Sequence, residues 1–240
     1  MDAYCHLDMD LEVKRQSPIA DIGQRMSTAD VSSALLVETW DGRNRRLLNG
    51  VLRKHRAGRF GVALCYRQDS FGELRRQLSE RGLTAVRMST QDIRRDASVC
   101  EDIYRAGKVL LTHAETGIGS LCRELSRIMA VMPELRVYVP HLGWPVAQGK
   151  ADFDWEGAVR ELATLPSVTF GVSAIAHFSR EPFPHNDVRD FALRVISQVG
   201  ASRIAIGSDY PLFDKARYAD YMFLARDWVA SIHPDWSFTF

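Results

Sequence analysis

The amino-acid sequence predicts one α/β domain, a single (β/α)8 TIM barrel over residues 1–240. Three observations predict this fold. Short apolar runs typical of buried strands recur along the chain, amphipathic stretches with helical periodicity separate them, and the composition does not change from one half to the other. The runs recur at close to the roughly 30 residues that one βαβ unit needs. With 240 residues, 46% of them hydrophobic, the chain is long enough to bury such a barrel.

The strands and helices follow in order. The first connection, residues 9–30, is the least regular part, so we expect the first βα unit to be short or distorted, with Pro18 at the start of its helix. An open doubly wound sheet is the alternative fold. It normally carries a glycine-rich phosphate loop after its first strand, and this chain has none. The eight expected strands are residues 1–7, 34–39, 60–66, 83–88, 109–113, 137–141, 168–173 and 204–208.

Charge and cysteine usage exclude several classes of protein. The 31 basic and 30 acidic residues give a formal net charge of +1, so no nucleic acid or anionic membrane partner is expected. No apolar stretch is long enough to span a bilayer, and the N-terminus lacks a basic and then apolar export signal. The four cysteines are scattered, which indicates neither a redox motif nor a zinc knuckle. We therefore expect a cytoplasmic protein with reduced thiols.

The active site of a barrel lies at the C-terminal ends of its strands. Tyr4 and His6 share one face of the first strand because side chains alternate, and Cys5 then points into the core. A single buried histidine would be an ordinary core residue, but here histidines and a carboxylate end several different strands. The polar residues at or near the strand ends are Tyr4, His6, Glu38, Arg67, Arg87, His113, His141, His177 and Asp209.

Four segments carry a resemblance to a known family. In order, DAYCHLD, LLTHAE, VPHLGWP and IGSDYP resemble the successive motifs of the amidohydrolase superfamily, especially its branch of amidohydrolase-related hydrolases and aromatic-acid decarboxylases. The resemblance spans nearly the whole chain, and HLGW and GSDYP are its most specific parts. It implies one metal ion bound by His6, His113 and Asp209, with His141 as an unligated catalytic histidine.

The chemistry of these side chains agrees with the implied roles. Two neutral imidazoles and one carboxylate hold a divalent metal, zinc first, with manganese or iron as alternatives. Water on such a metal can lose a proton near pH 7, and Asp209 could accept it. His141 would hydrogen-bond the substrate carbonyl or the developing oxyanion, where one well-placed donor is worth roughly 3 kcal/mol.

Two positions depart from the family pattern. Tyr4 stands where the family has histidine, or glutamate in some decarboxylases, and a phenol with a pKa near 10 is a poor metal ligand. We therefore expect weaker metal binding and keep Tyr4 as a catalytic candidate, a proton donor or a substrate contact. The fourth strand ends in Arg87, where TatD-type deoxyribonucleases have glutamate and dinuclear amidohydrolases a carboxylated lysine. One metal ion is therefore expected rather than two.

Further residues are candidates for substrate binding. Arg87 and Arg67 could each form a bidentate pair with a substrate carboxylate, or form a salt bridge with Glu38 or Glu115 instead. Glu38 is itself a candidate substrate contact. Trp144 could wall the pocket or pack under a loop, and His177 could belong to a lid or to an ordinary rim loop.

The sequence thus predicts a metal-dependent hydrolase that cleaves a C–O or C–N bond in a small carboxylated substrate. Decarboxylation of an aromatic or unsaturated acid at the same site is one alternative. A degenerate, metal-free barrel that binds a small molecule or serves as a partner subunit is another. The aromatic C-terminus, with Trp236, Phe238 and Phe240, should pack under the barrel or meet a second subunit, which leaves a homodimer open.

Overall fold

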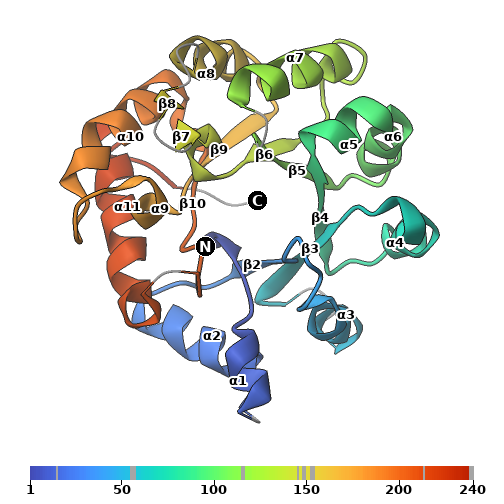
Figure 1. Cartoon of the computed structure of the whole chain (residues 1–240), viewed down its shortest axis with the longest axis horizontal. Coiled ribbons are helices and arrows are strands. Elements are labelled where there is room, and N and C mark those ends of the chain that lie inside the picture. The colour runs from blue at the N-terminus through green and yellow to red at the C-terminus, as the bar shows by residue number, and fades with distance from the viewer. Residues whose placement is uncertain are drawn as a thin grey trace.

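Eight parallel strands form one sheet that follows the order of the chain around a barrel, and helices surround it (Figure 1). The computed structural model describes residues 1–14, 16–54, 58–114, 117–144, 146–147, 150–151, 155–212 and 214–237. The predicted (β/α)8 fold is confirmed. The barrel strands are β1 (Asp2–Cys5), β2 (Ala34–Val37), β3 (Phe60–Cys65), β4 (Leu83–Ser89), β5 (Val109–His113), β6 (Val137–Val139), β9 (Val168–Val172) and β10 (Ile204–Ile206).

Helices connect the strands and cover the outside of the sheet (Figure 1). Pro18 begins the second helix, as predicted, and the Ser17 side chain caps it by accepting from the main-chain N–H of Ala20 at 3.3 Å. The helices are α1 (Met9–Val13), α2 (Pro18–Thr28), α3 (Arg45–Lys54), α4 (Phe71–Gln77), α5 (Thr90–Arg95), α6 (Ala97–Arg105), α7 (Ile118–Met129), α8 (Trp155–Ala163), α9 (Ile175–Phe178), α10 (Asn186–Gln198) and α11 (Tyr218–Ile232).

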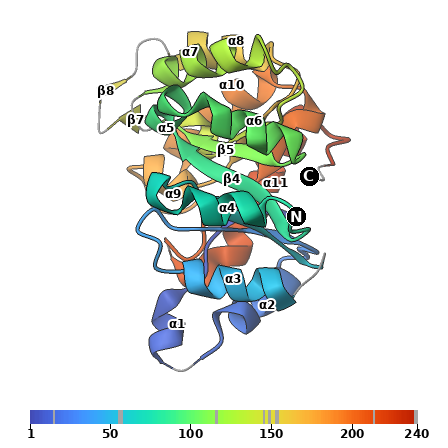
Figure 2. The same ribbon diagram turned by 90° about the vertical axis from the view of Figure 1, so that its right-hand side faces the viewer.

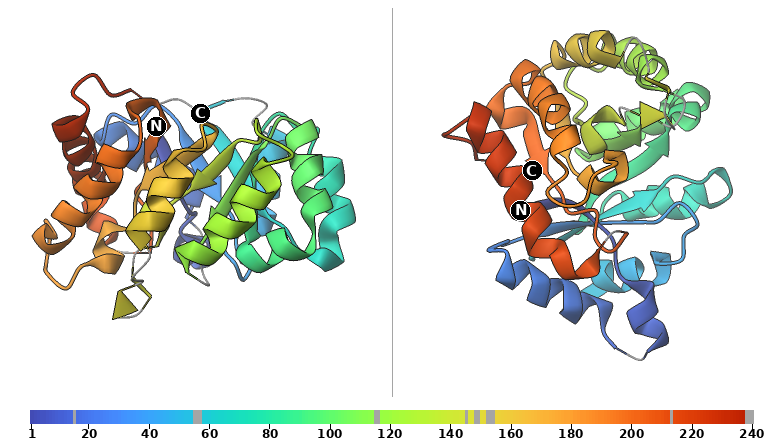
Figure 3. Two further views of the ribbon diagram at one scale, coloured as in Figure 1. Left: turned by 90° about the horizontal axis from the view of Figure 1, so that it is seen from above. Right: turned by 60° about the vertical axis from the view of Figure 1, so that its left-hand side comes forward.

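Several predicted strands are too long at their C-terminal ends. The sixth, expected to reach His141, stops at Val139 because Pro140 has no N–H to donate and His141 adopts a positive φ of 57°. A short antiparallel hairpin that the sequence did not suggest follows it, with β7 at Val146–Ala147 and β8 at Lys150–Ala151. Figure 2 shows this hairpin projecting from one end of the barrel, and Figure 3 shows the N-terminus at the opposite end.

The first strand is irregular, as expected. Its register against β2 shifts between Asp2 and Cys5, so that Ala3 and Tyr4 both pack inside the barrel while Cys5 packs outside against the helices. In the described residues no strand ladder joins β10 to β1. The Asp209 N–H instead donates to the Tyr4 carbonyl at 2.9 Å, and the His6 N–H donates to the Tyr210 carbonyl at 2.6 Å. This seam brings the first and last predicted site residues together.

The C-terminal end of the described chain packs under the barrel. The Trp236 indole N–H donates to the carbonyl of Ile204 at 2.9 Å, at the start of the last strand. Phe238 and Phe240 lie outside the described residues. None of the described helices combines the length and the apolar character that a membrane crossing requires.

Candidate functional site

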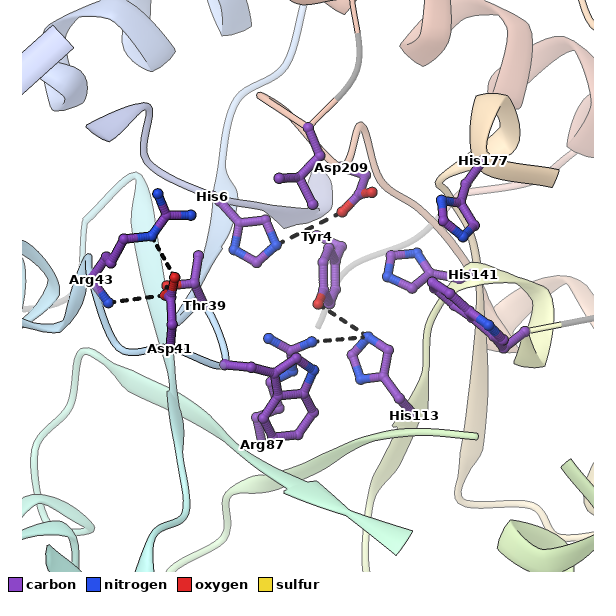
Figure 4. A pocket seen from close by; sticks show the side chains of 13 residues that line it. Tyr4, His6, Thr39, Asp41, Arg43, Arg87, His113, His141, His177 and Asp209 are labelled. Atoms are coloured by element: carbon purple, nitrogen blue, oxygen red, sulfur yellow. Dashed lines mark hydrogen bonds and ion pairs between the residues drawn. The ribbon is translucent and has the colours of Figure 1, made fainter. Parts of the chain in front are cut away.

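A pocket of about 680 Å³ opens at the C-terminal ends of the strands (Figure 4). All but two of the predicted site residues line it. The pocket thus brings together side chains from both ends and the middle of the sequence. The lining residues are Tyr4, His6, Thr39, Trp40, Asp41, Arg43, Arg87, His113, His141, Trp144, His177, Asp209 and Leu212.

Tyr4 lies at the centre of this site. Its ring centroid is 5.2 Å from that of His6, 5.6 Å from that of His113 and 4.5 Å from that of His141. The phenol oxygen lies 3.1 Å from His113 Nε2. Tyr4 therefore contacts all three histidines, and His113 and His141 also contact each other, with ring centroids 5.0 Å apart.

His6 and Asp209 face each other across the seam. His6 donates its Nδ1–H to the Val37 carbonyl at 2.7 Å, which leaves a lone pair on Nε2, 3.8 Å from Asp209 Oδ1. That carboxylate oxygen is buried and has no hydrogen-bond partner among the described residues. Burial raises the pKa of Asp209 well above its usual range, whereas burial and the Arg87 charge lower the pKa of His6 to about 3. His6 is therefore a neutral acceptor at physiological pH.

Asp2, which sequence reasoning did not single out, holds the turn that carries Asp209. Its Oδ1 accepts from the main-chain N–H groups of Tyr4 at 3.2 Å and Ser208 at 3.0 Å. Its Oδ2 accepts from the hydroxyls of Ser208 at 2.6 Å and Tyr218 at 3.0 Å. Asp209 itself has a positive φ of 56°, an uncommon conformation for a residue with a side chain. The two bonds from Ser208 to Asp2 stabilise this turn from outside the barrel.

Arg87 is a buried cation in the middle of the site. Nη1 donates to the main-chain carbonyl of Glu38 at 2.7 Å, and the guanidinium carbon lies 3.9 Å from the centroid of the Trp40 ring. Nη2 lies 3.3 Å from His113 Nε2. Arginine only donates, so Nε2 accepts and Nδ1 of His113 carries the ring proton. Burial, and then the Arg87 charge, lower the pKa values of His113 and His141 well below their usual range.

The predicted metal site is only partly assembled. His6 suits a ligand role because its other nitrogen is held by a main-chain carbonyl, as in many metal-binding histidines, and Asp209 offers an unpaired oxygen beside it. Among the residues that the structure describes, however, no three His, Cys, Asp or Glu side chains are grouped closely enough to hold a metal ion. His113 does not join the pair because Arg87 and Tyr4 contact its Nε2. The predicted three-ligand set is reduced here to two residues.

Glu38 and Arg67 were predicted to bind substrate, with a salt bridge between them as the alternative, and the structure contains this salt bridge. Glu38 is fully buried outside the pocket and forms ion pairs with Arg45 at 3.0 Å and Arg67 at 2.9 Å. It also accepts from the Cys65 N–H at 2.7 Å. The alternative salt bridge therefore describes this pair, and neither side chain lines the pocket. Glu115, the other proposed partner, lies outside the described residues.

Aromatic side chains form the walls of the pocket. The Trp144 ring lies 5.5 Å from that of His141 and 4.7 Å from that of His177, and both Trp144 and His177 line the pocket. Across from them, the exposed Trp40 lies 5.9 Å from His113. Trp40 stands at the end of the second predicted strand, but it was not chosen as a site residue.

A sequence profile described as Amidohydrolase matches residues 13–232, most of the chain. The chain belongs to the amidohydrolase family. Membership of this family indicates an enzyme of the hydrolase or lyase type, in agreement with a pocket at the C-terminal face of the barrel. The chain matches none of the curated proteins.

Solved structures with low sequence identity share the fold. An amidohydrolase from Burkholderia multivorans with bound zinc has 18% identity and a TM-score of 0.71, covering 98% of this chain and 92% of its own. A Pseudomonas putida protein assigned as a 2-pyrone-4,6-dicarboxylic acid hydrolase has 19% identity and a TM-score of 0.66, covering 95% and 89%. One with the same assignment from Acinetobacter baumannii, with citric acid bound, has 15% identity and a TM-score of 0.71, covering 97% and 92%.

Proposed function

We propose that this amidohydrolase cleaves a C–O or C–N bond in a small carboxylated substrate. One observation carries the proposal. The unpaired carboxylate oxygen of Asp209 and the Nε2 lone pair of His6 face each other in a pocket that also holds the buried Arg87 cation. A base beside a fixed positive charge is what activation of water and binding of an anionic substrate require.

Each residue has a distinct part in this proposal. Asp209 takes the proton from the attacking water, because its unpaired Oδ1 lies in the pocket beside His6. Arg87 attracts the substrate carboxylate, since a guanidinium is always charged and is only weakly hydrated. His141 donates a hydrogen bond to the oxygen on which negative charge develops. Trp40 and Trp144 lie along the pocket beside the reacting groups.

His6 and Asp209 would hold a divalent metal ion, and zinc is the first choice. The zinc bound to the Burkholderia relative supports this part of the proposal. When bound, the metal supplies a Lewis acid and lowers the pKa of a coordinated water. With only two protein ligands grouped together, affinity for zinc should be weak compared with that of a site with three.

The test combines metal analysis with turnover. Protein purified without chelator is assayed on lactones, amides and aromatic acids, with and without added zinc, alongside His141→Ala and Asp209→Asn. Hydrolysis of a lactone or amide by the wild type supports the hydrolase, provided that the rate falls by orders of magnitude in both variants while they keep their fold. Release of carbon dioxide from an aromatic acid would instead identify a decarboxylase, and no turnover of any of these classes would contradict the proposal.

A further inference from the structure

The segment that carries His141 has a strained backbone. His141, Leu142, Gly143 and Trp144 all have positive φ, at 57°, 54°, 74° and 57°. For residues with a side chain this left-handed conformation costs about 1–2 kcal/mol each, and it persists only where surrounding contacts enforce it. At Gly143 a Cβ atom would come within 2.5 Å of Ile118 Cδ1, so a larger residue there would be strained by the positive φ and would have to displace that side chain.

One side chain from a neighbouring strand holds this turn at His141. Ser173 follows directly after β9 and is fully buried. Its Oγ accepts from the main-chain N–H of His141 at 3.1 Å and lies 2.9 Å from Nδ1 of the same residue. A single hydroxyl therefore contacts both the backbone and the ring of His141, which fixes the ring relative to its own strained main chain.

The position of the hydroxyl proton determines the protonation of the ring. A serine hydroxyl has one proton and two lone pairs, and a buried hydroxyl places its proton on a protein acceptor. The main-chain N–H of His141 already uses one lone pair. The proton can go to His141 Nδ1 or to the neighbouring phenol oxygen of Tyr138. An imidazole nitrogen is a much stronger base than a neutral phenol oxygen, so Nδ1 receives it.

We propose that Ser173 is a positioning residue that donates to Nδ1 of His141 and thereby keeps the ring as the tautomer with its proton on Nε2. The ring lines the pocket, and Figure 4 shows it directed toward Tyr4 and His113. His141 is thus a hydrogen-bond donor to the ligand rather than a base. This deepens the proposed function, on which the catalytic consequence rests, but the tautomer can be measured without any turnover.

The test uses protein labelled with ¹⁵N in histidine. Long-range ¹H–¹⁵N correlation spectra at pH 8, where an imidazole is neutral, distinguish a proton on Nε2 from one on Nδ1. The signals of His141 are those missing from the spectrum of His141→Gln. We expect Nε2 protonation in the wild type and in Ser173→Thr, which keeps the hydroxyl. Ser173→Ala, which lacks it, should lose this preference and give a mixture of tautomers.

The outcomes separate this inference from the proposed function. A proton on Nδ1 in the wild type, or an unchanged tautomer in Ser173→Ala, would overturn the inference. If Ser173→Ala does not fold, the wild-type and Ser173→Thr spectra still decide. On a substrate that the wild type turns over, Ser173→Ala should lower kcat roughly tenfold or more with little change in KM, and Ser173→Thr should restore it. A wild type with the expected tautomer but no turnover would refute the proposed function alone.

Discussion

Nη2 of Arg87 lies 3.3 Å from Nε2 of His113, and this contact keeps His113 from acting as a third metal ligand beside His6 and Asp209. Replacing Arg87 with Met removes the fixed charge and one of two contacts at Nε2 of His113, and it leaves the contact with the Tyr4 hydroxyl in place. Repulsion between a divalent ion and a buried guanidinium amounts to several kcal/mol at an effective dielectric constant near 20. We therefore expect Arg87→Met to bind zinc at least about tenfold more tightly than the wild type, as measured by competition with a chromophoric chelator.

The matched control for this variant is Arg67→Met. Arg67 also carries a guanidinium near the end of a strand, but it pairs with Glu38 and does not line the pocket. Its removal should leave zinc affinity unchanged. Equal affinities in the wild type and Arg87→Met would mean that something other than Arg87 keeps His113 from the metal.

The second prediction concerns Glu38, whose carboxylate holds two strands and a helix together rather than contacting the pocket. Glu38→Ala leaves Arg45 and Arg67 without their shared partner and the Cys65 N–H without its acceptor. We expect the free energy of unfolding in urea to fall by about 3 kcal/mol. The KM for any substrate found should stay within about twofold of the wild type. A raised KM with normal stability would restore the sequence-based assignment of Glu38 to substrate binding.

The barrel could be predicted from the sequence because apolar runs and helical stripes reflect burial. Burial can be inferred from the local pattern of apolar and polar residues. Alternation likewise placed Tyr4, His6 and Cys5 on the correct faces. The same local signals could not show which buried polar groups pair. Glu38 and Arg67 end adjacent strands and resemble ligands for a substrate, but only the register of β2 against β3 shows that they meet each other.

The supporting roles of Asp2 and Ser173 could not be predicted from the sequence either. Both contact residues that follow other strands, Asp2 with Ser208 after β10 and Ser173 with His141 after β6. Each contact depends on how the barrel closes and on the positive φ angles of the turns that follow β6 and β10. Hydrophobic periodicity carries no information on either feature. The ends of the predicted strands nevertheless gave the correct region for eight of the ten candidate side chains, as judged by the lining of the pocket.

The third prediction tests Asp2 as the support of the Asp209 turn. In Asp2→Ala, four hydrogen bonds lose their acceptor, including those from the Ser208 main chain and hydroxyl. We expect a loss of about 3 kcal/mol in unfolding free energy, and faster hydrogen exchange at the Asp209 amide, which donates to the Tyr4 carbonyl. Tyr218→Phe, which removes one bond away from that turn, should leave the exchange at Asp209 slow. Equal exchange in both variants would rule out a specific support of Asp209.

The last prediction concerns acid stability. Burial, followed by the Arg87 charge, lowers the pKa of His141 well below its usual 6.5. Below about pH 6.5 the unfolded chain binds a proton at His141 and the folded protein does not. The free energy of unfolding therefore decreases as the pH falls. The decrease due to this residue is up to about 1.4 kcal/mol per pH unit. The full contribution to stability is present above pH 6.5. His141→Gln removes this dependence.

Urea unfolding of the wild type and His141→Gln between pH 7 and pH 4.5 measures the difference. Asp209 acts with the opposite sign, because its raised pKa lets the folded state bind the extra proton, so its contribution falls as the pH rises. Asp209 is present in both proteins and largely cancels when one curve is subtracted from the other. The decline with acid should therefore be shallower in His141→Gln, and parallel curves would show that the His141 ring takes up a proton as readily in the folded barrel as in the unfolded chain.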